Sequence, residues 1–265
     1  PRSPAAPPTI SPMPSERPEI AVEAAGRAVA VSNPGKVWFA ERGETKLDLV
    51  RYYAAIEEPL LRAIGGRPVL LERYPDGAAG KSFFQKRVPA SAPDWLTTVR
   101  VATPNGTESD ALVARDLAHV LWAVNAGCLG FHAWPVRAER PGIADELRID
   151  LDPQPGTGFA DARRIALDVV RPLLDELGYR GFPKTSGGRG IHVYVRIEPR
   201  WTFVEVRRAA IAFAREVERR AGDAVTTAWW KEQRGERVFV DYNQNARDRT
   251  IASAYSARPT PRATV

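Results

Sequence analysis

Two aspartates separated by one apolar residue, in the run Leu147-Arg148-Ile149-Asp150-Leu151-Asp152-Pro153, constrain this chain more than any other feature. The alternation predicts a strand on which Asp150 and Asp152 project from one face, while Ile149 and Leu151 face a core. Like charges on one face are unfavourable unless a cation lies between them. Because hard divalent cations prefer carboxylate oxygens, the pair indicates a metal site at the end of a strand.

A third aspartate, Asp241, ends a second apolar run, Val238-Phe239-Val240. Three strand-borne aspartates that converge at the ends of a sheet would hold two metal ions about 3.5–4 Å apart, which activate an attacking oxygen and neutralise a leaving pyrophosphate. The alternative is that Asp150 and Asp152 are solvated carboxylates at a strand end and that Asp241 is a turn residue.

A glycine-rich segment, Thr185-Ser186-Gly187-Gly188-Arg189-Gly190-Ile191-His192, follows further along the chain. Its glycines would let backbone N–H groups approach phosphate oxygens, and Ser186, Arg189 and His192 would add donors. The alternative is a plain β-hairpin loop, in which glycine adopts positive φ at little cost. Because the segment joins two expected strands, it does not fit a Rossmann or P-loop unit. A metal site beside a polyphosphate site favours nucleotidyl transfer.

Helical and strand patterns interleave along the chain, which predicts a mixed α and β fold. Helices are expected over 45–64, 109–126, 159–177 and 203–220, and strands over 68–73, 83–88, 130–136, 146–152, 179–184, 191–197 and 237–242. Thr45 and Ser109 are the expected caps of the first two helices. Residues 1–26, which are rich in proline, are expected to form a flexible arm, and 27–265 the folded domain.

Composition narrows the class of partner and the compartment. Lys and Arg number 38 against 32 Asp and Glu, a net charge of +6 that admits nucleic acid or an anionic membrane as partner. A single cysteine, Cys128, excludes an intrachain disulfide framework and a cysteine-based zinc site, and it favours a reducing compartment. No run approaches the roughly 18 apolar residues of a membrane span, and no signal peptide is expected.

Basic and aromatic groups indicate contacts with nucleic acid. Asn33 and Lys36, together with Lys46 in the first turn of an expected helix, would jointly hold a phosphate, because a helix N-terminus attracts anions. The alternative is a pair of solvated surface lysines. One of Phe83 and Phe84 must face away from the core on a strand, which makes the pair a candidate for base stacking unless both faces are buried.

With these segments in place, the chain resembles the polymerase domain of bacterial DNA ligase D, a member of the archaeo-eukaryotic primase superfamily. The resemblance extends from about Ala28 to the C-terminus. The motifs that carry it are, in order, Ser32–Val37, Arg73–Gly77, Phe83–Lys86, Ile149–Pro153, Thr185–His192, Val238–Asp241 with Gln244 and Asn245, and Tyr255–Arg258. It implies an α+β fold, with a primase-type catalytic core of β-sheets flanked by helices.

The resemblance also implies roles for individual residues. Asp150, Asp152 and Asp241 would be catalytic and would bind two divalent ions, Mn²⁺ or Mg²⁺. The incoming NTP or dNTP would be bound by His132, Ser186, Arg189, His192, Gln244 and Arg258. On DNA, a 5′-phosphate beyond a gap would be held by Asn33, Lys36 and Lys46, the template by Phe83 and Phe84, and the primer or second end by Arg234.

The function implied is a template-directed polymerase that prefers ribonucleotides, fills short gaps and aligns DNA ends in non-homologous end joining. Its setting would be the bacterial cytoplasm at the nucleoid, with broken or gapped DNA, Ku and a DNA ligase as partners and no membrane. A stand-alone primase-polymerase of gap repair and an end-bridging module with little catalysis are the alternatives. Glu72 stands where many relatives have a basic residue, and Arg189 where Lys is frequent, a change that alters phosphate geometry.

Overall fold

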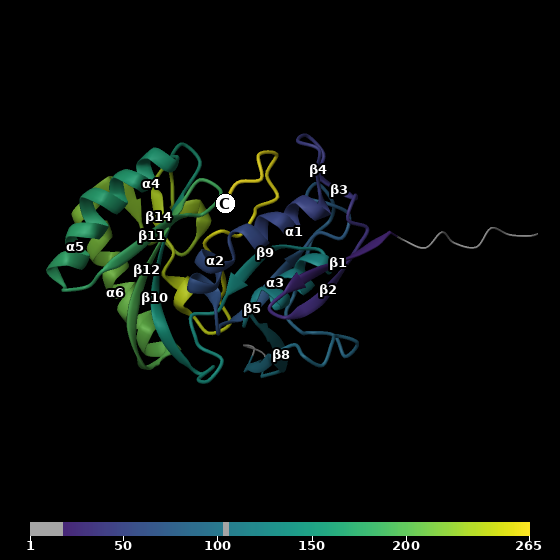
Figure 1. Ribbon diagram of the computed structural model, residues 1–265. Helices are drawn as coiled ribbons and strands as arrows, with labels where there is room; N and C mark the ends of the chain where they lie inside the picture. The colour runs from purple at the N-terminus through teal and green to yellow at the C-terminus, as the bar shows by residue number, and fades with distance from the viewer. Residues whose placement is uncertain (1–17, 103–105) are drawn as a thin grey trace, which may run out of the picture.

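The computed structural model describes residues 18–102 and 106–265. Within them, most strands belong to two sheets that lie side by side, each with helices against it (Figure 1). The six-stranded sheet has the order β15-β9-β5-β8-β7, with β6 added to β5, and the five-stranded sheet has the order β11-β12-β10-β14-β13. The mixed α and β class expected from the sequence is therefore confirmed.

The first half of the chain builds all of the six-stranded sheet except β15. Its elements are β1 Glu19–Ala24, β2 Arg27–Ser32, β3 Val37–Phe39, β4 Glu44–Thr45, α1 Lys46–Ala55, α2 Glu57–Ile64, β5 Pro68–Arg73, β6 Phe83–Gln85, β7 Thr98–Ala102, β8 Glu108–Val113, α3 Leu117–Asn125 and β9 Cys128–Ala133. The core of this half packs α1 and α3 against the sheet. Tyr53 is fully buried in it and donates its hydroxyl to the Leu129 carbonyl at 2.6 Å.

The second half builds the five-stranded sheet and its helices. Its elements are β10 Ile143–Pro153, α4 Phe159–Ile165, a π-helical turn η1 Ala166–Val170, α5 Arg171–Glu176, β11 Gly181–Thr185, β12 Ile191–Thr202, α6 Phe203–Ala221, η2 Gly222–Ala224, β13 Val225–Thr226, η3 Lys231–Gln233, β14 Val238–Val240, η4 Tyr242–Asn245 and β15 Ile251–Ala252. Strand alternation places Ile149, Leu151 and Val193 on one face, in the core that Ala214 and Val217 of α6 complete. The other face is polar.

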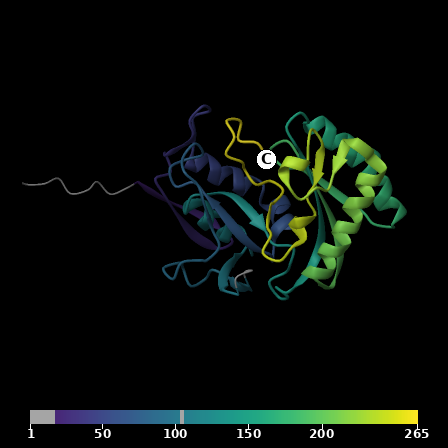
Figure 2. The ribbon, with the colours of Figure 1, turned by 180° about the vertical axis from the view of Figure 1, so that it is seen from behind.

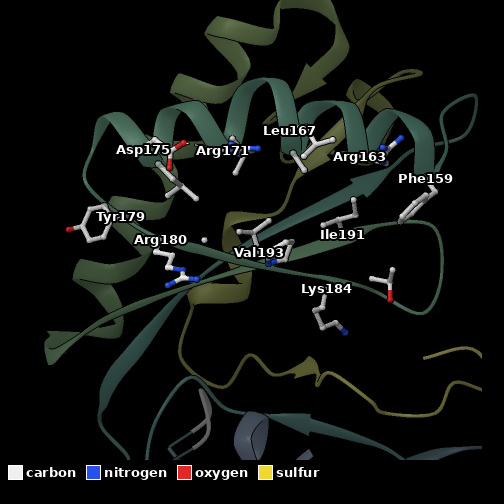
Figure 3. A pocket seen from close by; sticks show the side chains of 16 residues that line it. Phe159, Arg163, Leu167, Arg171, Asp175, Tyr179, Arg180, Lys184, Ile191 and Val193 are labelled. Carbon is white, nitrogen blue, oxygen red and sulfur yellow. Dashed lines mark ion pairs between the residues drawn. The ribbon is translucent and has the colours of Figure 1, made fainter. Parts of the chain in front are cut away.

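The helices do not cover the apolar face of the five-stranded sheet completely. A hollow of about 480 Å³ separates α4, η1 and α5 from β11 and β12, with Leu167, Ile191 and Val193 on its walls (Figure 3). The expected helix over 159–177 is thus real, but its middle is a π-helical turn, which widens the helix locally. In the described part of the chain, no helix is long and apolar enough to span a bilayer.

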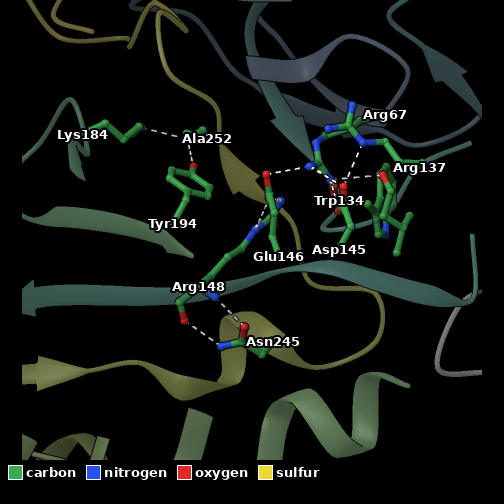
Figure 4. A network of polar contacts seen from close by, with 11 residues as sticks. Arg67, Trp134, Arg137, Asp145, Glu146, Arg148, Lys184, Tyr194, Asn245 and Ala252 are labelled. Atoms are coloured by element: carbon green, nitrogen blue, oxygen red, sulfur yellow. Dashed lines mark hydrogen bonds and ion pairs between the residues drawn. The ribbon is translucent and has the colours of Figure 1, made fainter. Parts of the chain in front are cut away.

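The C-terminal segment runs between the two halves, as both views show (Figures 1 and 2). Strand β15 leaves the second half and pairs with β9 of the first, Ala252 opposite His132. A second link is Arg67, which precedes β5 and donates to Asp145 at 2.6 Å and to Glu146 at 2.7 Å, both on β10 (Figure 4). These links set how the polar face of the five-stranded sheet meets the other sheet.

The first expected helix and the expected N-terminal arm both differ from the observed structure. The helix over 45–64 begins after Thr45, whose side chain forms a capping box with Asp48, but it breaks at Ile56 into α1 and α2. The expectation of a flexible arm over 1–26 is wrong for Glu19–Ala24, which pairs with β2 along its whole length. The buried Val29 and Val31 of β2 hold that hairpin on the core. Residues 1–17 lie outside the described residues.

The helix expected over 109–126 is also corrected. Glu108–Val113 is a strand, β8, which pairs with β7 and β5, and the helix begins only at Leu117. Long-range strand pairing outweighs the local helical pattern there. The cap is Asp116, whose carboxylate accepts from the His119 backbone N–H at 3.2 Å and pairs with Arg27 at 2.9 Å.

Replacing the observed cap should destabilise the protein, whereas replacing the expected one should not. Asp116→Ala removes an N-cap and the carboxylate that pairs with Arg27, so we expect a loss of about 1–2 kcal/mol in the free energy of unfolding. Ser109→Ala is the matched control and should change the free energy by less than about 0.5 kcal/mol, because Ser109 caps no helix. Urea unfolding followed by circular dichroism measures both. Equal losses would contradict this assignment of the cap.

Candidate active site

A row of charged side chains crosses the polar face of the five-stranded sheet. Lys184 of β11 lies opposite His192 of β12, and His192 lies opposite Asp150 of β10. On the other side of β10, Leu151 pairs with Val240 of β14. Asp241, the residue that follows β14, donates its backbone N–H to the Asp150 carbonyl at 2.8 Å. Opposite residues on antiparallel strands share a face. The side chains of Lys184, His192, Asp150 and Asp241 therefore follow one another across four strands.

The third aspartate lies on the same face, at the exposed end of β10. Asp152 is two residues beyond Asp150, and its carboxylate accepts from the Gln154 amide at 3.1 Å. Asp241 accepts from the Asn243 backbone N–H at 2.9 Å and from the Gln244 amide at 3.1 Å. The structure thus brings the three expected aspartates and Gln244 to one place. The register thus places the three aspartates on one sheet face, and their joint role in binding metal stays a prediction.

The three carboxylates repel one another. Burial, followed by the charges of Asp241 and Asp152, raises the pKa of Asp150 from 3.8 to about 8, and only part of this is opposed by Lys184 and Gln244. Burial, with the neighbouring Arg258, lowers the pKa of Lys184 to about 7, so this residue is a weak counter-charge. Burial, together with Lys184 and Arg148, holds the pKa of His192 well below its ordinary value.

Carboxylates that lack a full counter-charge offer the oxygen ligands that a hard divalent cation prefers. The His192 Nε2 atom lies 3.6 Å from the Asp150 carboxylate and adds a nitrogen beside the oxygens. Across the described ranges, however, no three His, Cys, Asp or Glu side chains are arranged closely enough to hold a metal ion. The residue types therefore fit a metal, and the structure does not define its coordination.

The glycine-rich segment is a tight hairpin between β11 and β12. The Ser186 hydroxyl accepts from the backbone N–H groups of Gly188 at 3.2 Å and Gly190 at 3.0 Å. A Cβ at Gly190 would lie 2.4 Å from the Leu151 carbonyl oxygen, so only glycine fits where the loop presses on β10. Arg189 is exposed at the tip. The hairpin geometry is confirmed, and the phosphate-binding role stays a prediction.

A cluster on the six-stranded sheet approaches this hairpin. Glu72 of β5 lies 3.0 Å from His132 Nε2 of β9, accepts from the Tyr74 hydroxyl at 2.8 Å and lies 3.5 Å from the Arg258 guanidinium. The Arg258 side chain passes over Gly187, where a Cβ would lie 2.4 Å from the Arg258 Cγ. His132 and Arg258 are thereby brought to the hairpin, as expected for two groups of one binding site.

Glu72 stands where many relatives have a basic residue, and only the structure shows its place in the candidate site. Burial raises the pKa of its carboxyl, but the hydrogen bonds from His132 and Tyr74 outweigh burial, and the pKa lies below its ordinary value. The ionised carboxylate therefore holds two candidate nucleotide contacts, His132 and Arg258, in position. The unusual charge next to Arg73 was the only signal for it in the sequence.

The residues expected at a 5′-phosphate also lie together. Lys46 is buried, donates to the Ser32 carbonyl at 2.8 Å and to the Asn125 amide oxygen at 2.7 Å, and its pKa is lowered to about 8 by burial and by Lys36 and Arg73. Lys36 donates to the Pro75 carbonyl at 2.6 Å. The idea that both lysines are solvated is wrong for Lys46, because its ammonium is buried and bonded to Ser32 and Asn125. Asn125 was missed, since nothing marks it in the sequence.

Phe83 and Phe84 connect this lysine cluster with the nucleotide candidates. Both rings are exposed, by 46% and 57%, so the pair offers more aromatic surface than the single ring expected. The Arg73 guanidinium lies 5.1 Å from the Phe83 ring centre, and Phe84 meets His132 edge-on at 5.3 Å. A continuous strip of cationic and aromatic groups therefore runs from Lys46 to the glycine-rich hairpin.

Arg234 lies on the other flank of the aspartates. Its guanidinium stacks 3.5 Å from the Phe239 ring centre and donates to the Ala228 and Trp229 carbonyls at 3.2 and 3.1 Å. With Asp241 and Gln244 it lines a small polar cavity of about 120 Å³. The structure thus separates Arg234 from the lysine cluster, with the aspartates between the two.

An aspartate row on one sheet, a glycine-rich hairpin beside it and a second sheet against it make up a primase-type catalytic core. The chain belongs to the family whose model is described as LigD, primase-polymerase domain, which matches residues 45–265. The fold class and the resemblance inferred from the sequence are both confirmed.

Individual relatives agree with this assignment. The chain is 34% identical over 249 residues to the multifunctional non-homologous end joining protein LigD of Mycobacterium bovis, covering 89% of this chain and 32% of that protein. It is 33% identical over 238 residues to the LigD of Pseudomonas aeruginosa, covering 90% and 28%. A structure of the polymerase domain of Mycobacterium tuberculosis ligase D in complex with DNA superposes with a TM-score of 0.84 at 32% identity, covering 89% of this chain and 85% of that one. The chain spans about a third of the length of the curated relatives it matches.

Removing one of the repelling carboxylates should stabilise the protein when no metal is present. Asp150→Asn keeps the size of the side chain and relieves burial of a charge beside Asp241, so we expect a gain of at least about 1 kcal/mol, or about 2–4 °C in Tm. Asp152→Asn, at the exposed end of the strand, is the matched control and should gain much less. Thermal unfolding in EDTA at pH 9, where Asp150 is ionised, measures both. A lower Tm for Asp150→Asn would contradict the repulsion.

Proposed function

We propose that this chain is a metal-dependent, template-directed nucleotidyltransferase that fills short gaps and aligns DNA ends in non-homologous end joining. The observation that carries the proposal is the row of Asp150, Asp152 and Asp241 beside the glycine-rich hairpin, Arg258 and His132. Two divalent ions held by these aspartates, Mn²⁺ or Mg²⁺, would activate the primer 3′-hydroxyl and neutralise the leaving pyrophosphate.

The protein's own groups position the nucleotide. The hairpin with Ser186 and Arg189, together with His192 below it, binds the triphosphate from the five-stranded sheet. His132 and Arg258 approach from the six-stranded sheet, where Glu72 fixes their orientation. Gln244 orients the Asp241 carboxylate through its amide. Closing the triphosphate between two sheets brings the α-phosphate to the aspartates, where the primer 3′-hydroxyl displaces pyrophosphate.

DNA binds along the cationic and aromatic strip. Lys36, Lys46 and Asn33 hold the 5′-phosphate beyond a gap, and a phosphate there would restore the full charge of Lys46, whose pKa burial has lowered. Phe83 and Phe84 stack against the template, because both rings are exposed. Arg234, on the far flank of the aspartates, contacts the primer or the second end.

A preference for ribonucleotides, the partnership with Ku and a DNA ligase, and action at the nucleoid in the bacterial cytoplasm belong to the same proposal and rest on the resemblance drawn from the sequence motifs. We also propose that the folded part of the chain acts as one polymerase unit. A second candidate function is end bridging with little catalysis. It is favoured by the lysine cluster, whose contacts do not involve the aspartates. A stand-alone enzyme of gap repair remains a third candidate.

Primer extension on a short-gapped duplex tests catalysis. Asp241→Ala and Asp150→Ala should each lower extension with Mn²⁺ by at least about 10³-fold, because each removes a donor from the reacting centre. Binding to the gapped DNA should remain. Ribonucleotides should be used faster than deoxyribonucleotides. Asp168→Ala, a matched aspartate in the π-helical turn, is the control. Extension by both active-site variants at the wild-type rate would exclude the proposed mechanism. DNA binding without any extension by the wild type would favour end bridging.

The lysine cluster predicts a preference for phosphorylated gaps. Lys36→Ala and Lys46→Met should each lower the ratio of affinities for 5′-phosphate and 5′-hydroxyl gapped duplexes by about tenfold, since each removes one charge-assisted contact. Fluorescence anisotropy at fixed salt measures the ratio. Lys81→Ala, a lysine outside the cluster, is the control and should leave the ratio unchanged. An unaltered preference in both cluster variants would place the phosphate elsewhere.

A further inference from the structure

A second polar cavity lies on the same face of the five-stranded sheet, beyond the row that contains Asp150. Its volume is about 390 Å³, within the range of small-molecule sites. The floor comprises Arg148 and Tyr194, the next residues along β10 and β12 on that face. The walls come from α2, β11 and the turn after β15. None of its lining residues belongs to the glycine-rich loop 186–190 or to the Glu72–His132–Arg258 cluster.

The lining of this cavity is strongly cationic. The five cations among its lining residues are Arg62, Arg67, Arg148, Lys184 and Arg196, and Glu146 is the one acidic side chain among them. Glu146 is already used, at 2.7 Å from Arg67 and 3.2 Å from Arg148 (Figure 4). Arg67 is also paired with Asp145 at 2.6 Å and Arg62 with Glu58 at 3.3 Å. Among the described lining residues this leaves Arg196 without an ion pair, and Arg148 with only a carboxylate that it shares with Arg67.

Two buried guanidinium groups in this cavity are incompletely satisfied. Arg148 is 2% exposed and Arg67 is 1% exposed. Among the described residues, the Arg148 Nη1 atom and the Arg67 Nε atom have no hydrogen-bond partner. An unpaired buried donor is costly, and its usual partners are a ligand, an ion or water. Arg196, which is exposed at the rim, likewise forms no ion pair within the described ranges.

Aromatic surface lies beside these cations. Phe182 of β11 is 43% exposed and Tyr255, after β15, is 41% exposed, and both line the cavity. The Arg180 guanidinium lies 5.3 Å from the Phe182 ring centre. Exposed aromatic rings beside several arginines are suited to a base on one side and a phosphate on the other. The volume also fits one nucleotide better than a bare anion.

We propose that this cavity is a second nucleotide site, which binds a nucleoside monophosphate separately from the triphosphate site. Arg148 and Arg196 bind the phosphate, and Phe182 and Tyr255 pack against the base. The proposal does not rest on the proposed polymerase function, because the residues that would bind the nucleotide here, Arg148, Arg196, Phe182 and Tyr255, have no role in that mechanism, and no metal is needed. The ligand is either a free nucleotide or the 5′-terminal nucleotide of a strand.

Isothermal titration of the whole chain with AMP in EDTA at low salt tests the proposal. We expect one AMP per chain, binding of adenosine at least about tenfold weaker, and a loss of about tenfold in AMP affinity in Arg196→Gln, as for one charge-assisted contact. Phe182→Ala should weaken AMP but leave inorganic phosphate unaffected. Arg148→Met should abolish binding, and circular dichroism checks that it folds. A 5′-phosphorylated dinucleotide that binds as well as AMP would identify a strand end as the ligand, and one that does not bind would identify a free nucleotide.

Two control variants locate the site. Arg215→Met, an exposed arginine on α6 across the sheet, should bind AMP like the wild type. Arg189→Gln, in the glycine-rich loop, should also leave AMP affinity unchanged. Loss of AMP binding in Arg189→Gln would mean that AMP enters the triphosphate site, and this would overturn the proposal. So would equal affinity for adenosine and AMP, an unchanged affinity in both Arg196→Gln and Phe182→Ala, or no AMP binding by the wild type. None of these outcomes depends on primer extension.

Discussion

The burial of Asp150 beside Asp152 and Asp241 is the constraint on which the arrangement of this structure depends. Three carboxylates on one sheet face cannot pack against an apolar layer, so that face meets another polar surface while the opposite face packs against α4, α5 and α6. Lys184, in the same row, compensates only part of the charge, because burial lowers its pKa to about 7. The site therefore lacks sufficient positive charge of its own, and a divalent ion would supply it.

The second sheet meets that polar face through a few ionic and backbone links. Arg67 reaches across to Asp145 and Glu146, and β15 pairs with β9. These links align His132 with the hairpin and leave two polar hollows, one at each flank of the aspartate row. Charged groups that bridge the two sheets thus hold the sheets together and also border the candidate site. The low dielectric of the interior strengthens their electrostatic interactions.

The sequence predicted correctly those features that depend only on residues within one short segment. The helix cap at Thr45, the hairpin at Ser186–Gly190 and the shared face of Asp150 and Asp152 are all local, and all are confirmed. It failed where a distant strand competes with a local pattern. Glu108–Val113 reads as part of a helix but pairs with β7 and β5, and Glu19–Ala24 reads as an arm but pairs with β2.

The sequence by itself determined which residue types the site would hold, because alternation, capping and glycine geometry act within a few residues. Only the tertiary structure decided what these residues meet. Register places Asp241 beside Asp150, packing buries Lys46 against Asn125, and the C-terminal segment delivers Arg258 to Glu72 and the hairpin. Contacts of this kind join positions far apart in the chain. Their free energy depends on burial and on the summed field of neighbouring charges, which no local pattern encodes.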